Sequence, residues 1–193
     1  HKEILDTVSW QSGDGAQSVE LTLVRHGETE KNEQGIVQGG NLDAPLNEKG
    51  KKQAKDAGAL LQKKKFDHII CSDLKRAQES AESIEAELGL PVEEPLALLR
   101  ERHAGSSSGR KDADVRSEHP LPKTMNLAFH FDTPQGGEPL SAFLTRIRET
   151  CEQLLEKYAG KKILIVAHRG TIQALQAVLE NKTYEEVATA GLQ

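Results

Sequence analysis

Two runs of β-branched and leucine residues constrain the fold of this chain more than any other feature. Residues 19–24 read Val-Glu-Leu-Thr-Leu-Val, and residues 162–167 read Lys-Ile-Leu-Ile-Val-Ala. Runs of this length and composition predict strands, and the second run predicts a strand that is buried on both faces. Each run leads directly into a histidine-containing segment, Arg25-His26 in the first case and His168-Arg169 in the second.

Helices and two further strands are predicted between these runs. Apolar residues at helical spacing predict helices that begin after Asn47, after Ser72 or Asp73, at Glu138 and near Gly170. Ser72 or Asp73 is expected to cap the second of these helices, and Gly89 and Pro91 are expected to end it. Short strands are predicted at His68–Cys71 and between Val92 and Leu99. Strands that alternate with helices in this way imply an α/β fold, a three-layer α/β/α sandwich with a mostly parallel central sheet.

The chain of 193 residues is long enough for one domain with a substantial core. We expect residues 1–18, which are polar and lack periodicity, to be a flexible N-terminal tail or a cloning remnant, and residues 19–193 to form a single domain. Because the first residue is His1 rather than Met, native N-terminal residues are expected to be missing. The irregular stretch 105–134, with a short helix around 112–118, is predicted to be an insertion over the active site.

Polar residues follow every predicted strand of the sheet. The carboxyl ends of parallel strands meet at one edge, where ligands bind in such folds. The residues expected there include three imidazoles, several guanidinium groups and one carboxylate: Arg25, His26, Arg76, Arg100, Glu101, Arg102, His103, His168, Arg169 and Gly170. Guanidinium groups bind phosphoryl oxygens bidentately, and neutral imidazole is a nucleophile near neutral pH. The set therefore predicts phosphoryl transfer, with arginines in place of a metal ion.

Composition narrows the range of partners. The net charge of −5 argues against nucleic-acid and anionic-membrane partners, and no apolar run is long enough to cross a bilayer. No cluster of residues has a recognisable metal-ligand spacing, so neither a metal nor a cofactor is predicted. Cys71 and Cys151 lie in apolar stretches and are expected to be buried free thiols. We expect a cytoplasmic enzyme with a small phosphorylated substrate, and the oligomeric state stays open.

The segment Leu23-Val24-Arg25-His26-Gly27-Glu28-Thr29 resembles the signature of the histidine phosphatase superfamily, which includes the phosphoglycerate mutases. The resemblance runs from about Leu21 to about Leu179 and is nearest to the TIGAR-type fructose-2,6-bisphosphatases. It also rests on Asn32, Gln38-Gly39, Pro45-Leu46, Ser72-Asp73-Leu74-Lys75-Arg76, Leu99-Arg100-Glu101-Arg102 and Pro134-Gln135-Gly136-Gly137-Glu138.

The resemblance implies a role for each matching residue. His26 would be the nucleophile, His168 would stabilise the transferring phosphoryl group, and Arg25 and Arg76 would bind the phosphate. Glu101 would protonate the leaving oxygen and then activate water. Asn32, Gln38, Gly39 and Gly170 would contact the substrate, whereas Arg102 and His103 fit a substrate contact and a solvated loop equally well.

The chain departs from the family pattern at three places. Arg169 stands where the family usually has glycine, and there it either adds a phosphate contact or crowds the site. Ala104 precedes Gly105, where an aromatic residue is common in the family. The chain ends soon after Val187, where relatives usually continue into another strand, so a truncated C-terminus is expected.

Three functions are compatible with these residues. The first is a phosphatase for small phosphorylated metabolites, with fructose-2,6-bisphosphate or another sugar phosphate as the family-derived substrate. The second is a phosphoglycerate mutase, although mutases of the superfamily carry a longer insertion than the one between Glu101 and Glu138. The third is a catalytically impaired member that binds a phosphorylated ligand or a partner.

Overall fold

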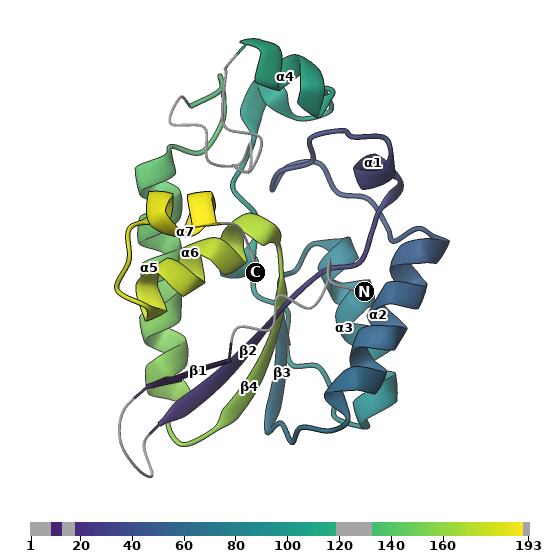
Figure 1. The fold of residues 1–193 in the computed structure, drawn as a ribbon, viewed down its shortest axis with the longest axis vertical. Helices are drawn as coiled ribbons and strands as arrows, with labels where there is room; N and C mark the ends of the chain where they lie inside the picture. Colours follow the sequence, from purple (N-terminus) through teal and green to yellow (C-terminus); the bar gives the residue numbers. More distant parts are fainter. Residues whose placement is uncertain (1–8, 13–17, 119–132, 191–193) are drawn as a thin grey trace.

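The parallel strands predicted from the apolar runs form the centre of the molecule. A computed structural model describes residues 9–12, 18–118 and 133–190, and in it the strand order is β1-β2-β4-β3 (Figure 1). Strand β2 (Val19–Arg25) pairs in parallel with β4 (Lys162–Ala167), which pairs in parallel with β3 (His68–Cys71). Strand β1 (Ser9–Ser12) is antiparallel to β2 at one edge. The carboxyl ends of the three parallel strands therefore lie at one end of the sheet.

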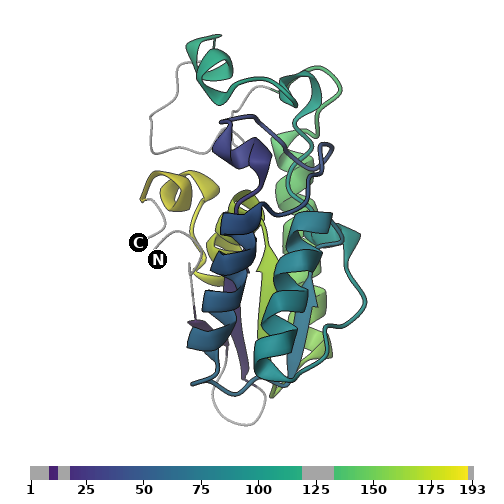
Figure 2. The ribbon, with the colours of Figure 1, turned by 90° about the vertical axis from the view of Figure 1, so that its right-hand side faces the viewer.

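Helices cover both faces of the sheet and confirm the three-layer α/β/α sandwich. Helices α2 (Glu48–Leu61) and α3 (Lys75–Leu88) lie on one face, as the side view in Figure 2 shows. Helices α5 (Leu140–Lys157), α6 (Arg169–Leu179) and α7 (Tyr184–Ala190) lie on the other. Each face has its own core of buried apolar residues. Cys71 and Cys151 are buried free thiols, as expected.

The segment 92–99 is not a strand, and this prediction was wrong. Val92 and Leu96 each form an isolated parallel bridge to the β3 side, and Ala97–Leu99 form the 3₁₀ helix η1. The amides of Glu93 and Leu96 donate to Ile69 and Cys71, but Pro95 between them has no N–H to give. The segment still runs along β3 and delivers the residues after it to the carboxyl end of the sheet.

The predicted cap of α3 was also wrong. The residue at the helix start is Leu74, which makes no side-chain cap, rather than Ser72 or Asp73. The Ser72 hydroxyl lies 2.8 Å from His168 Nε2, and the Asp73 carboxylate accepts two hydrogen bonds from Arg100. Both side chains are therefore engaged outside the helix. Two other predicted helix ends are confirmed: Asn47 is the N-cap of α2, and Gly89 is the C-cap of α3.

Shorter elements stand beyond the carboxyl end of the sheet. They are α1 (Glu30–Glu33), η2 (Gly105–Ser107) and α4 (Asp112–Glu118), the last as predicted (Figure 1). Residues 119–132 of the predicted insertion, and 1–8 and 13–17 of the predicted tail, lie outside the described residues. Residues Ser9–Ser12 of the predicted tail form β1, so a flexible tail was the wrong prediction for these four residues. No helix in the described ranges is both long and apolar enough to span a membrane.

The packing of α6 against the sheet generates a stability prediction. Leu175 of α6 is fully buried, whereas Leu60 of α2 is 50% exposed. Leu175→Ala should lower the free energy of unfolding by about 2–5 kcal/mol, because it removes buried methyl groups and leaves a cavity. Leu60→Ala, the same substitution in a helix, should change it by less than about 1 kcal/mol. Urea unfolding of both variants measures the two values, and equal losses would contradict the assigned core.

Candidate active site

His26 lies at the end of β2, and its ring Nε2 faces the Arg76 guanidinium group. Its backbone N–H donates to the Ala167 carbonyl at 3.0 Å, which extends the pairing of β2 with β4 by one residue. Ring Nδ1 lies 2.7 Å from the Gly27 carbonyl, a partner that can only accept, so Nδ1 carries the proton. Nε2 accepts a hydrogen bond from Arg76 Nε at 3.3 Å and therefore presents a lone pair.

The surroundings of His26 keep its imidazole neutral. The side chain is buried. Burial, followed by the charges of Arg76 and Arg25, lowers the pKa of His26 well below its ordinary value. A neutral imidazole whose Nε2 lone pair is available is the form needed for nucleophilic attack.

Gly27 allows the turn after β2 to pack tightly against α2. A Cβ at Gly27 would lie 2.4 Å from the Gly50 carbonyl oxygen, so no larger residue fits without a shift of the backbone. The Gly27 N–H donates to Ser80 Oγ at 2.9 Å, which ties the turn to α3 as well. The position of the His26 ring is therefore fixed by both helices of that layer.

Arg76 brings a buried cation to His26. It projects from the first turn of α3 and is 2% exposed. Nη1 donates to the Leu42 carbonyl at 3.1 Å and to Asp43 Oδ1 at 3.2 Å, and Nη2 donates to the Gly39 carbonyl at 2.8 Å. These contacts orient the guanidinium group so that Nε faces His26. Burial lowers the pKa of Arg76, and the charges of Asp43 and Glu101 oppose that shift.

His168 faces His26 from the end of β4. The two ring centroids are 5.2 Å apart, and the planes are tilted by 57°. Nε2 lies 2.8 Å from Ser72 Oγ, whereas Nδ1 is buried and has no hydrogen-bond partner within the described parts of the chain. Burial, then Arg76, His26 and Arg25, lowers the pKa of His168 well below its ordinary value. Nδ1 is thus a polar atom available to a ligand in the site.

Glu101 completes the centre with a buried carboxyl group. Oε1 accepts from the Arg102 N–H at 2.9 Å, and Oε2 accepts from the Gly170 N–H at 2.8 Å. Burial raises the pKa of Glu101, and those two hydrogen bonds with the charges of Arg76 and Arg25 only partly offset it. A carboxyl group in this environment holds a proton more tightly than one in water and can act as a general acid.

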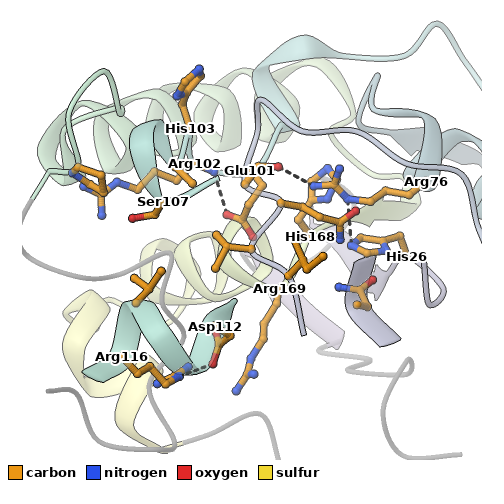
Figure 3. A pocket seen from close by; sticks show the side chains of 18 of the residues that line it. His26, Arg76, Glu101, Arg102, His103, Ser107, Asp112, Arg116, His168 and Arg169 are labelled. Atoms are coloured by element: carbon orange, nitrogen blue, oxygen red, sulfur yellow. Dashed lines mark hydrogen bonds and ion pairs between the residues drawn. The ribbon is translucent and has the colours of Figure 1, made fainter. Parts of the chain in front are cut away.

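These groups line one pocket of about 280 Å³ (Figure 3). It contains all but two of the residues expected at the site: Arg25, His26, Asn32, Gln38, Gly39, Arg76, Glu101, Arg102, His103, His168 and Arg169. Arg100 is outside the lining and forms an ion pair with Asp73. Gly170 is outside the lining and contributes the N–H that binds Glu101. Asn32 Oδ1 also accepts from the N–H of Thr29, the N-cap of α1. Gln38 accepts from the Thr29 hydroxyl, and Arg102 Nε donates to the Glu138 carbonyl.

Several lining residues were not predicted. They come from the 36–37 segment and from the irregular region after Glu101: Ile36, Val37, Ala104, Ser107, Asp112, Val115, Arg116, Thr133 and Pro134. The predicted insertion at 105–134 was a signal for the residues from Ser107 to Pro134, although it named a region and no residues. Ile36, Val37 and Ala104 lie outside that region. Within the described residues, no group of three or more His, Cys, Asp or Glu side chains could hold a metal ion.

The match to a known family decides the identity. A model described as the histidine phosphatase superfamily (branch 1) matches residues 21–192. The chain belongs to this superfamily. The resemblance read from the segment around His26 is therefore confirmed, and this histidine phosphatase has the enzyme class and the phosphoglycerate mutase-like fold that it implied.

The relatives of this histidine phosphatase carry several different names. It is 36% identical over 160 residues to phosphoglycerate mutase-like protein 4 of Arabidopsis thaliana, covering 81% of this chain and 69% of that protein. It is 37% identical over 147 residues to the fructose-2,6-bisphosphatase TIGAR of Bos taurus, covering 73% of this chain and 53% of that one. The chain thus spans about half the length of TIGAR.

A solved structure matches over most of the fold. The mycobacterial glucosyl-3-phosphoglycerate phosphatase in complex with VO₃ has a TM-score of 0.75 and 29% sequence identity to this histidine phosphatase. The match covers 88% of this chain and 84% of that structure. The sandwich fold is therefore shared with this solved phosphatase.

The two lowered histidine pKa values predict how stability depends on pH. Between those values and about 6.5, the unfolded chain binds protons that the folded protein does not, so the free energy of unfolding rises with pH. Stability should therefore fall as the pH drops below about 6.5, by up to about 1.4 kcal/mol per unit for each histidine. The raised pKa of Glu101 acts in the opposite direction and is common to all variants that keep it.

The measurement is urea unfolding between about pH 5 and pH 7.5 for the wild type and for a variant with His26→Asn and His168→Asn. The variant should show a smaller loss of stability on acidification, because it lacks the two groups that take up protons on unfolding. An identical pH dependence in the two proteins would contradict the buried neutral state of the imidazoles.

Proposed function

We propose that the protein hydrolyses phosphate monoesters of small metabolites through a phosphohistidine at His26. Fructose-2,6-bisphosphate or another sugar phosphate is the leading candidate for the substrate. The observation that carries the proposal is the lone pair on His26 Nε2, which faces Arg76 Nε in the pocket that His168 and Glu101 also line.

The first step would transfer the phosphoryl group to His26. Nε2 attacks phosphorus while Arg25 and Arg76 bind the phosphoryl oxygens, and the Arg76 Nε–H moves from His26 to one of those oxygens. His168 Nδ1 donates to another oxygen, with Nε2 held by the Ser72 hydroxyl. The bond from phosphorus to the ester oxygen breaks, and that oxygen takes the proton of Glu101.

The second step would return His26 to its starting state. The Glu101 carboxylate takes a proton from a water molecule, whose oxygen attacks phosphorus and displaces Nε2. Inorganic phosphate leaves, His26 is neutral again, and Glu101 is protonated again. No step needs a metal ion, because the guanidinium groups supply the positive charge.

The known relatives support a small-molecule substrate. TIGAR and the mycobacterial phosphatase are named for phosphorylated sugars or sugar acids, and the pocket has a volume suited to a molecule of that size. The proposed partner is a small phosphorylated metabolite. We propose neither a nucleic-acid nor a membrane partner, and we propose the cytoplasm as the location of the enzyme. The finer choice among such metabolites depends on the part of the pocket away from His26.

The first test is the covalent intermediate. His26→Ala should abolish turnover and the acid-labile phosphoenzyme while the protein keeps its fold, because Ala has no atom to accept the phosphoryl group. The assay measures phosphate release from sugar phosphates and phosphoglycerates with EDTA present, and phosphoenzyme after a rapid quench. His68→Ala, at the opposite end of β3, is the matched control and should retain turnover.

Other outcomes of the same assay would change the function. Phosphate bound stably to another residue of the wild type would exclude His26 as the nucleophile. Transfer to a second hydroxyl of a phosphoglycerate, with little release to water, would make the protein a mutase. Absence of turnover and of phosphoenzyme with every substrate would make it a binding protein.

The second test separates the acid role of Glu101 from a structural role. A sugar alkoxide needs a proton to leave, whereas nitrophenolate hardly does. Glu101→Gln should therefore slow phosphorylation of His26 by a sugar phosphate by about a hundredfold or more, and by nitrophenyl phosphate much less. Pre-steady-state mixing of the variant with each substrate measures the phosphorylation step. Equal losses with both substrates would show that Glu101 positions the site without donating the proton.

A further inference from the structure

The pocket holds more positive charge than one phosphate group requires. Five of its lining residues are arginines: Arg25, Arg76, Arg102, Arg116 and Arg169. Two guanidinium groups balance the charge of one phosphoryl dianion at His26, and His168 adds a hydrogen-bond donor. The arginines farther along the pocket therefore need another explanation.

Arg169 is the most unusual of these cations. It is the first residue of α6, directly after His168, and its side chain extends away from the imidazole pair (Figure 3). Its Nε is buried, and among the described residues that atom has no hydrogen-bond partner. A guanidinium N–H that is withdrawn from water without a partner costs free energy.

Helix stability does not account for Arg169. A positive charge in the first turn of a helix is unfavourable, because the N-terminus of the helix already carries partial positive charge. The Gly170 N–H next to it is turned toward Glu101 and helps to place the acid. An anion bound at this position would offset the cost of the cation.

Arg116 contributes a second available group from α4. Its Nε donates to Asp112 Oδ2 at 2.6 Å, which fixes the side chain along the helix. Its Nη1 is buried without a partner among the described residues. Asp112 and Arg116 lie on the side of the pocket toward which Arg169 extends (Figure 3). Two guanidinium groups and one carboxylate leave this part of the pocket with a net positive charge.

We propose that the substrate carries a second anionic group, a carboxylate or a second phosphate, which Arg169 binds together with Arg116 while the scissile phosphate lies at His26. The proposal rests on the proposed phosphatase function and narrows its substrate to small phosphate esters that carry a second anionic group, here called doubly anionic. Both anions suit planar guanidinium forks, and a buried N–H of each arginine is the donor that the second group would satisfy.

Pairs of substrates that differ in one charged group test the proposal. In 3-phosphoglycerate and glycerol 3-phosphate a carboxylate replaces a hydroxymethyl group, and fructose 2,6-bisphosphate and fructose 6-phosphate differ by one phosphate. The wild type should have the higher kcat/KM for the doubly anionic member of at least one pair, and that pair identifies the second group. Arg169→Gln should lower this preference by about tenfold or more, the usual value of a charge-assisted hydrogen bond.

Two further variants serve as comparisons. Arg116→Gln should lower the same preference, whereas Arg148→Gln removes one positive charge from the exposed side of α5 and should leave the preference unchanged. Melting curves of all three variants establish that each is folded. A loss of preference in Arg148→Gln equal to that in Arg169→Gln would attribute the effect to overall charge and overturn the proposal.

The same measurements distinguish a failure of the second-anion site from a failure of the proposed phosphatase function. A wild type that hydrolyses all four substrates without preferring the doubly anionic members would overturn the second-anion site and leave the phosphatase intact. An unchanged preference in Arg169→Gln would do the same. A wild type that forms no phosphoenzyme with any of them, nor with nitrophenyl phosphate, would overturn the proposed function itself.

Discussion

The parallel pairing of β2 with β4 determines the geometry of the whole site. In this register Val24 lies beside Val166 and Arg25 beside Ala167. The residues that follow the two strands therefore reach the same edge of the sheet. The His26 N–H continues the ladder to Ala167, and His168 follows one residue later. Two imidazoles from opposite ends of the domain sequence are thereby brought to a centroid separation of 5.2 Å. Strand β3 then ends at the same edge and supplies Ser72 to His168.

Burial at that edge has opposite effects on the two kinds of titratable group, and both effects suit catalysis. Removal from water disfavours the charged form, so the pKa values of His26 and His168 fall and the pKa of Glu101 rises. The charges of Arg76 and Arg25 reinforce the first shift and oppose the second. One environment thus favours the uncharged forms of His26, the proposed nucleophile, and of Glu101, the proposed acid.

The sequence predicts those parts of the molecule in which local pattern and tertiary structure agree. The apolar runs of β2 and β4 fix both histidines, because a buried strand leaves its first polar residues at its end. The segment 92–99 has the composition of a strand, but Pro95 breaks the pairing. Ser72 looked like a helix cap and instead contacts His168, a partner that only the folded chain supplies. Arg116 could not be predicted, since its place in the pocket depends on how α4 stands over the sheet.

The pocket is therefore built from two kinds of structure. The half around His26 is set by strand ends and by helices packed on the sheet, and its contacts leave little freedom: Gly27 has no room for a Cβ beside Gly50. The other half comes from the 36–39 segment, η2 and α4, which lie beyond the sheet and are joined to each other by a single bridge between Ile36 and Lys111 and a few backbone hydrogen bonds. The 36–39 segment also meets the first half, because the Gly39 carbonyl accepts from Arg76 Nη2. The side chains of η2 and α4, such as Ser107 and Val115, line the pocket from beyond the sheet. Lining segments of this kind are where proteins that share one sandwich can differ in the ligands that they bind.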